Sequence, residues 1–131
     1  GIKEILFPEK GIKINIISFS YRFGIPKDAD IVIDARCLPN PHYVERLKSL
    51  TGKDRRVKNF IFKNKEAKDF IEKLESFFDF SIPLFEKEGK NVLIIAVGCT
   101  GGRHRSVAVG SHLKTFLKKK GYRVNVFYRD I

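Results

Sequence analysis

Residues 92–106, VLIIAVGCTGGRHRS, hold the clearest fold signal in this chain. Val92 to Val97 is an unbroken run of six apolar residues, the pattern of a strand buried on both faces. The loop from Gly98 to Ser106 follows, and Val107 to Lys120 then has the composition of a helix whose last turn is basic. A strand, a glycine-rich loop and a helix in direct succession indicate one unit of an α/β sheet.

The flanking segments supply further strands and a short helix. Residues 12–19 alternate β-branched and polar side chains and predict a strand, and residues 31–33 form the apolar centre of a second one. Asn40, with Pro41 behind it, predicts the start of a short helix that reaches about residue 50. Residues 122–128 predict the final strand.

A long amphipathic helix is expected in the middle of the chain. Asn64 fits its N-cap, and apolar residues from Ala67 to Phe85 recur at spacings of three and four. Pro83 is expected to kink or split this helix. The basic stretch of residues 55–65 before it is expected to be a loop or frayed structure.

The order of these elements predicts the fold class. Strand, strand, helix, helix, strand, helix, strand fits a single α/β domain over residues 1–131, with a largely parallel central sheet flanked by helices. Ligands of such sheets bind beyond the carboxyl ends of the strands. Those ends are expected at Asp34 and at Gly98.

Composition narrows the classes of protein. Only two cysteines are present, Cys37 and Cys99, which is too few for a disulfide framework. Three scattered histidines argue against a structural zinc site, and no cofactor is expected. No apolar run approaches the length that spans a bilayer, so no membrane partner and a cytoplasmic location are expected. Gly1 stands where a start methionine would be, which fits a trimmed end or a piece of a longer chain.

Positive charge is concentrated in two segments. The net charge is +11; residues 46–65 and 103–131 together hold 16 Lys or Arg against 2 acidic residues, and the rest of the chain holds 10 against 13. Charge confined in this way favours a surface that binds a polyanion. A solvated surface of a basic protein would show the same counts.

The loop from Gly98 to Ser106 has the properties of an anion cradle. Its three glycines allow backbone N–H groups to converge, and the following helix directs its positive end at the loop. The side chains add hydroxyl and guanidinium donors. The loop is neither a Walker A motif nor GxGxxG. The predicted ligand-binding residues are His42, Cys99, Thr100, Gly101, Gly102, Arg103, His104, Arg105 and Ser106.

The same loop also permits a catalytic hypothesis. Five residues separate Cys99 from Arg105, which is the spacing of the cysteine phosphatases, and a helix N-terminus lowers the pKa of a thiol. Asp34 and Asp130 are the candidates for a general acid. The simpler interpretation is that Cys99 is a small residue at the end of a buried strand. Whether the protein is an enzyme stays open, and binding without catalysis is favoured.

Several blocks of the sequence resemble the C-terminal domain of the RapZ/YvcJ family. They are AVGCTGGRHRSV at residues 96–107, SFSYRFGIP at 18–26, DAD at 28–30, DARCLPNPHY at 34–43, LTGKD at 50–54 and GYRVNVFYRD at 121–130. Two departures are a Ser at position 20, where the family usually has Gly, and the end of the chain at Ile131, before the family's basic tail. Full-length members also carry an N-terminal P-loop domain, and no such domain is expected within these 131 residues.

The resemblance implies a regulatory RNA-binding domain, which in some members presents RNA to a ribonuclease. It also implies sensing of glucosamine 6-phosphate at the Cys-Thr-Gly-Gly loop. The pocket residues that it implies, by matching position, are His42, Cys99, Thr100, Gly101, His104 and Arg105. This strengthens the case for His42, which the chain alone would equally place at the start of a surface helix.

Three hypotheses follow for the function. The first is a non-catalytic module that binds RNA and a phosphorylated sugar or other small anion; the second is a phosphatase that uses Cys99 and Arg105; the third is a metabolite sensor without RNA binding. A ribonuclease and a second copy of the chain are further candidate partners. The predicted RNA-binding residues are Arg55, Arg56, Lys58, Lys118, Lys119, Lys120, Arg123 and Arg129. Aromatic residues that could stack on bases, or equally belong to the core, are Tyr43, Phe60, Phe62, Tyr122 and Tyr128.

Overall fold

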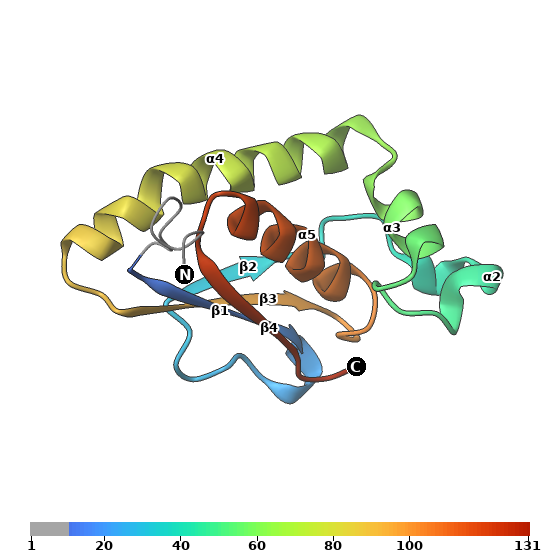
Figure 1. Ribbon diagram of the computed structural model, residues 1–131. Coiled ribbons are helices and arrows are strands. Elements are labelled where there is room, and N and C mark those ends of the chain that lie inside the picture. Colours follow the sequence, from blue (N-terminus) through green and yellow to red (C-terminus); the bar gives the residue numbers. More distant parts are fainter. Residues whose placement is uncertain (1–10) are drawn as a thin grey trace, which may run out of the picture.

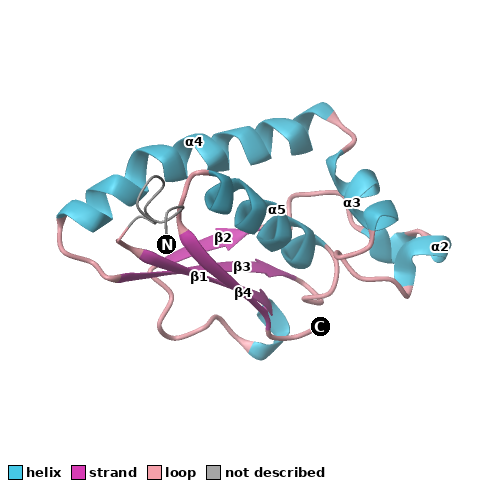
Figure 2. Cartoon of the chain, viewed as in Figure 1, coloured by secondary structure: helices cyan, strands magenta, loops and turns pink. Residues whose placement is uncertain are grey.

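The computed structural model describes residues 11–131 and contains a four-stranded parallel sheet. The strands are β1 (Lys13–Ser20), β2 (Ile31–Asp34), β3 (Val92–Cys99) and β4 (Arg123–Tyr128), and their order across the sheet is β2-β3-β1-β4. All three neighbouring pairs are parallel, so the arrowheads in Figure 2 point the same way. The predicted α/β fold with a parallel sheet is confirmed. The expectation for Gly1 lies outside the described residues.

Two helices cover one face of this sheet. The long helix α4 (Lys65–Lys87) and the helix α5 (Arg105–Lys119) lie on the same side in Figure 1. The alternation along β1 agrees, because Ile14 and Ile16 are fully buried whereas the neighbours Asn15 and Ile17 are half-buried. Strand and helix residues meet in one apolar core, in which each fully buried Leu or Ile stabilises the fold by about 1.5–3 kcal/mol.

A short helix, α3 (Arg55–Phe62), corrects the prediction of a loop over residues 55–65. Asp54 caps it, since its Oδ1 accepts a hydrogen bond of 2.8 Å from the backbone N–H of Arg56. Val57 and Ile61, four residues apart, are both fully buried. The abundance of Lys and Arg in this stretch concealed the apolar pair, which is enough to anchor a helix of two turns.

The other helical predictions hold in part. Asn64 caps α4 as expected, with its Oδ1 accepting from Ala67 N at 2.8 Å. The expected split at Pro83 is wrong, because α4 continues through it; the buried residues Phe78 and Ile82 hold the turn before the proline against the core. The expected helix after Asn40 is interrupted and consists of the 3₁₀ turn η2 (Pro41–Tyr43) and the single-turn α2 (Glu45–Lys48).

Candidate anion-binding site

The carboxyl ends of three strands meet at one edge of the sheet. In the parallel register Ser20 of β1 pairs with Cys99 of β3, and Asp34 of β2 pairs with Gly98. The segments that leave these ends enclose a pocket of about 390 Å³. Its lining residues are Arg22, Asn40, His42, Tyr43, Cys99, Thr100, Gly101, Arg103, His104 and Arg105. The edge predicted from the strand order is therefore hollowed, and three separate segments contribute to it.

The loop between β3 and α5 is shaped by its glycines and by Ser20. Gly102 has a φ of 71°, and a Cβ there would lie 2.9 Å from the backbone nitrogen of Ser20, so only glycine fits. Gly101 faces open space in the pocket. The hydroxyl of Ser20 donates a 2.6 Å hydrogen bond to the carbonyl of Thr100 and accepts one from Arg22 N at 3.1 Å.

Arg105 is a buried cation in the wall of the pocket. Only 6% of the residue is exposed, and its guanidinium donates to the carbonyls of Arg36 (2.7 Å) and Leu38 (3.2 Å) and to the hydroxyl of Thr100 (3.3 Å). Among the described residues no carboxylate forms an ion pair with it, and Asp34 interacts with it only through the charge, without a hydrogen bond. A buried charge is normally neutralised by a partner of opposite sign. Arg105 therefore leaves positive charge at the pocket that an anion would compensate.

Two further arginines reinforce this positive charge. Arg22, from the 3₁₀ turn η1 (Tyr21–Phe23) behind β1, and Arg103 from the β3–α5 loop are both exposed residues of the lining. None of the ten lining residues is an Asp or Glu. Sequence reasoning missed Arg22 and Asn40, because only the pairing of the strands brings their segments to the loop.

His104 is held by a segment on the far side of the loop. Its Nε2 donates to the carbonyl of Lys48 at 3.2 Å, and only 7% of the residue is exposed. This burial lowers the pKa of His104 below its ordinary value, so the imidazole is neutral at neutral pH. Gly52 lies against the same backbone: its N–H donates to the Arg103 carbonyl at 2.8 Å, and a Cβ would lie 2.2 Å from the His104 carbonyl oxygen.

His42 and Tyr43 form the exposed rim of the pocket. Asn40 fixes their turn, since its Oδ1 accepts from His42 N at 3.1 Å. The two rings meet edge to face with centroids 5.6 Å apart, and Tyr43 is 84% exposed. The structure thus brings His42 to the loop that contains His104, although 61 residues separate them in sequence.

Cys99 lies at the floor, where its thiol is engaged. It is 2% exposed; its Sγ accepts from Ser106 N at 3.4 Å and donates to Ser106 Oγ at 3.2 Å. Ser106 is fully buried and also bonds Ser18, Oγ to Oγ, at 2.9 Å. Gly102 and Ser106 do not belong to the lining, so of the predicted residues these two shape the loop from behind.

Asp34 and Asp130, the two candidates for a general acid, form hydrogen bonds with other residues outside the pocket. Hydrogen bonds from Arg36 lower the pKa of Asp34, and hydrogen bonds from Arg129 and from the backbone of Ser20 outweigh burial and lower that of Asp130. Both are therefore ionised at neutral pH and cannot donate a proton there. Neither residue lines the pocket. Over residues 11–131, no three His, Cys, Asp or Glu side chains are grouped so that they could hold a metal ion.

Comparison with known proteins identifies the family. The family model of the RapZ C-terminal domain matches residues 12–131. The chain belongs to this family. A nucleotide-binding protein of Thermoanaerobacter sp. (strain X514) is 53% identical to it over 122 residues, which cover 93% of the chain and 43% of the relative. A nucleotide-binding protein of Clostridium botulinum (strain Loch Maree / Type A3) is 46% identical over 123 residues, which cover 94% and 42%. The chain thus spans less than half the length of these relatives.

In this RapZ C-terminal domain the eight basic residues predicted for RNA form two groups. Arg55, Arg56 and Lys58 lie on α3, which follows the Gly52 contact with the pocket loop, and Arg129 follows β4 at the same edge of the sheet. The other four lie at the far end of α5 and the start of β4: Lys118, Lys119, Lys120 and Arg123. Lys58 of the first group reaches Ser111 midway along α5, so about 10 Å of helix separates it from Lys118 of the second.

Some of these cations have partners. Arg56 pairs with Asp54 at 2.9 Å, Lys120 with Asp79 at 3.4 Å and Arg129 with Asp130 at 2.9 Å. Of the predicted stacking residues, Tyr122 is buried in the core. Phe60 and Phe62 are partly buried and pack against the core. Tyr43 is the one most open to a base. None of the helices in residues 11–131 has the length and apolar character needed to cross a bilayer.

Proposed function

We propose that this domain binds RNA and a small phosphorylated sugar such as glucosamine 6-phosphate, with a phosphate group held in the pocket at the carboxyl edge of the sheet. The observation that supports this best is the buried Arg105 guanidinium, whose hydrogen bonds go only to carbonyl and hydroxyl oxygens. A phosphate would supply the missing negative charge and accept paired hydrogen bonds.

The surroundings of Arg105 suit a phosphate. The loop around Gly101 leaves room for an anion to approach the backbone, and α5 begins at Arg105 with its positive end toward the pocket. Arg22 and Arg103 add charge from either side. A volume of about 390 Å³ lies in the range of small-molecule sites. The rim residues Asn40, His42 and Tyr43 would then face the sugar.

RNA binding would use the same kind of contact. The phosphates of RNA meet Lys and Arg side chains irrespective of sequence, and the α3 group with Arg129 lies nearest the pocket. Relatives that share this domain are named nucleotide-binding proteins, which agrees with a ligand that carries phosphate. Binding of a ribonuclease, which the family resemblance implies, and of a second copy of the chain stay predictions.

The test measures binding of glucosamine 6-phosphate by calorimetry and of labelled RNA at several salt concentrations. Arg22→Ala removes an exposed pocket cation without removing a core contact, and Arg55→Ala removes an exposed arginine outside the lining. We expect Arg22→Ala, but not Arg55→Ala, to weaken sugar phosphate binding, and RNA binding to weaken as salt rises. Sugar phosphate binding without RNA binding would instead support a metabolite sensor. Absence of both would refute the proposal.

A further inference from the structure

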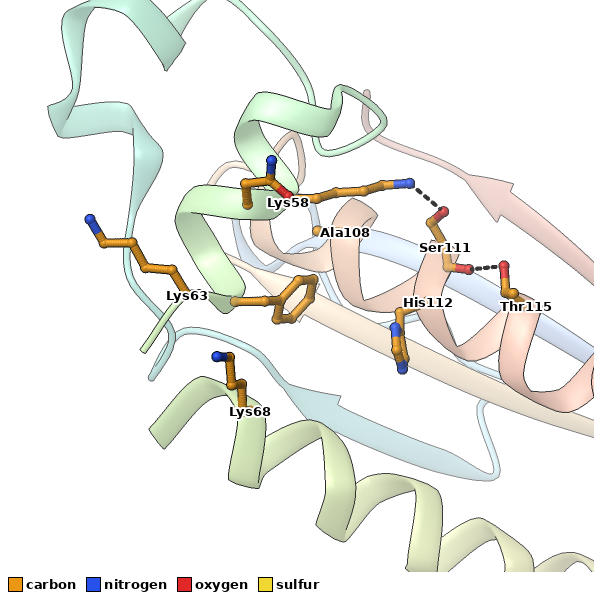
Figure 3. Close-up of a pocket in the computed structure, with 9 residues that line it drawn as sticks. Lys58, Lys63, Lys68, Ala108, Ser111, His112 and Thr115 are labelled. Atoms are coloured by element: carbon orange, nitrogen blue, oxygen red, sulfur yellow. Dashed lines mark hydrogen bonds between the residues drawn. The ribbon is translucent and has the colours of Figure 1, made fainter. Parts of the chain in front are cut away.

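A second pocket lies between α3, α4 and α5, outside the site described above. Figure 3 shows its lining residues on the three helices. The volume of the pocket is about 540 Å³. Its lining residues are Lys58, Asn59, Phe62, Lys63, Lys68, Ala108, Ser111, His112 and Thr115. The lining holds three lysines and no Asp or Glu.

One side of the pocket is cationic and rich in hydroxyls. Lys58 crosses from α3 to α5, where its Nζ donates to Ser111 Oγ at 3.0 Å, and Lys68 rises toward the gap from α4 (Figure 3). The ammonium group of Lys63 points away, at the rim. Within residues 11–131 none of these lysines forms an ion pair with a carboxylate. Thr115, whose Oγ1 donates to the Ser111 carbonyl at 3.3 Å, adds a second hydroxyl.

The other side of the pocket is formed by two aromatic rings. The rings of Phe62 and His112 lie 6.1 Å apart at 49°. An adjoining hollow of about 340 Å³ shares Phe62, Lys68 and His112 with the pocket and adds Ile71 and Glu72. Glu75 bonds His112 Nε2 at 3.0 Å and holds its ring in place. A ligand that fits would have an anionic end and a flat aromatic end.

The two pockets lie along one face of the same helix. His104 lines the first; Ala108, Ser111 and Thr115 follow at intervals of four, three and four residues, which keep one side of an α-helix. At 1.5 Å per residue the step from His104 to Ser111 is about 10 Å. The short helix α3 lines the second pocket, and Gly52 in the segment before it contacts the loop of the first.

We propose that this second pocket holds one nucleotide of a single-stranded RNA that also occupies the anion site. A backbone phosphate would lie between Lys58 and Lys68, within reach of the Ser111 and Thr115 hydroxyls, and the base would stack against Phe62. This inference rests on the proposed RNA binding and adds a specific position for the strand. It assigns Lys68 to RNA, which the sequence did not indicate.

The test compares two lysines of one helix. Lys68→Ala removes a pocket cation, and Lys73→Ala removes an exposed lysine of α4 that is not in the lining. Binding of a labelled RNA of about eight nucleotides is measured against salt for both. We expect Lys68→Ala to weaken binding severalfold and to lower the slope of log affinity against log salt by about 0.7, the contribution of one phosphate contact in a single strand. Lys73→Ala should leave the slope unchanged.

Lys58→Ala/Lys68→Ala extends the test and should lower the slope by about twice as much. Equal slopes for folded Lys68→Ala and Lys73→Ala would overturn the inference while the proposed function stands. A wild-type protein without RNA binding would refute both. Weaker binding of adenosine monophosphate by Lys68→Ala, with RNA binding intact, would overturn RNA as the occupant.

Discussion

The guanidinium of Arg105 donates a 2.7 Å hydrogen bond to the backbone carbonyl of Arg36, and so joins the start of α5 to the loop behind β2. Its second carbonyl partner is Leu38 at 3.2 Å. The residue that charges the pocket is therefore also the residue that holds the two loops together. Substitutions at this position must separate these two roles.

Arg105→Ala is expected to abolish sugar phosphate binding and to destabilise the domain by about 1–3 kcal/mol, because two buried carbonyls lose their donor. Arg105→Lys keeps the positive charge but loses the planar guanidinium, which can donate paired hydrogen bonds. Compared with Arg105→Ala, it should restore more of the stability than of the affinity for sugar phosphate. Urea unfolding and calorimetric titration on the same preparations separate the effects. Full affinity in folded Arg105→Ala would contradict the assigned role.

Gly52→Ala should destabilise the fold, since the added Cβ would meet the His104 carbonyl oxygen at 2.2 Å. Overpacking of this kind costs about 1–3 kcal/mol. Gly101→Ala is the matched control, because a Cβ there meets nothing within 4 Å. Urea midpoints of the two variants should differ accordingly. Equal stability would show that the 48–52 segment is not held against the pocket loop.

Stability should fall as the pH drops through the range in which His104 titrates. Burial lowers the pKa of His104 from 6.5, so below about that pH the unfolded chain binds a proton that the folded protein does not. The free energy of unfolding then decreases with decreasing pH. His104→Gln should flatten this decrease, relative to the wild type, between neutral pH and pH 5. Chemical unfolding at several pH values measures both slopes.

Much of the fold could be predicted because its strongest signals are local. A few adjacent residues are enough to predict several elements. The apolar run before Gly98 predicts β3, the glycines after it predict the loop, and Asn64 predicts the start of α4. Helix α3 was missed because its apolar content is only the pair Val57 and Ile61, within a basic stretch.

Only the part of the candidate site that one continuous segment forms could be predicted from the sequence. The loop residues from Cys99 to Arg105 are adjacent in sequence, and the family resemblance added His42. Arg22 became visible only through the pairing of β1 with β3, which no local pattern encodes. The second pocket combines side chains of three helices, one of which was not expected, so it could not be predicted from local patterns.

Cys99→Ser distinguishes a binding pocket from a phosphatase. The thiol donates to Ser106 Oγ and accepts from Ser106 N, and a serine hydroxyl can replace both interactions. We therefore expect the variant to fold and to bind glucosamine 6-phosphate as the wild type does. Phosphate release from a generic phosphomonoester should be absent in both, because Asp34 and Asp130 are ionised at neutral pH and lie outside the pocket lining. Release by the wild type that disappears in Cys99→Ser, with binding retained, would instead make Cys99 the nucleophile and Arg105 its phosphate ligand.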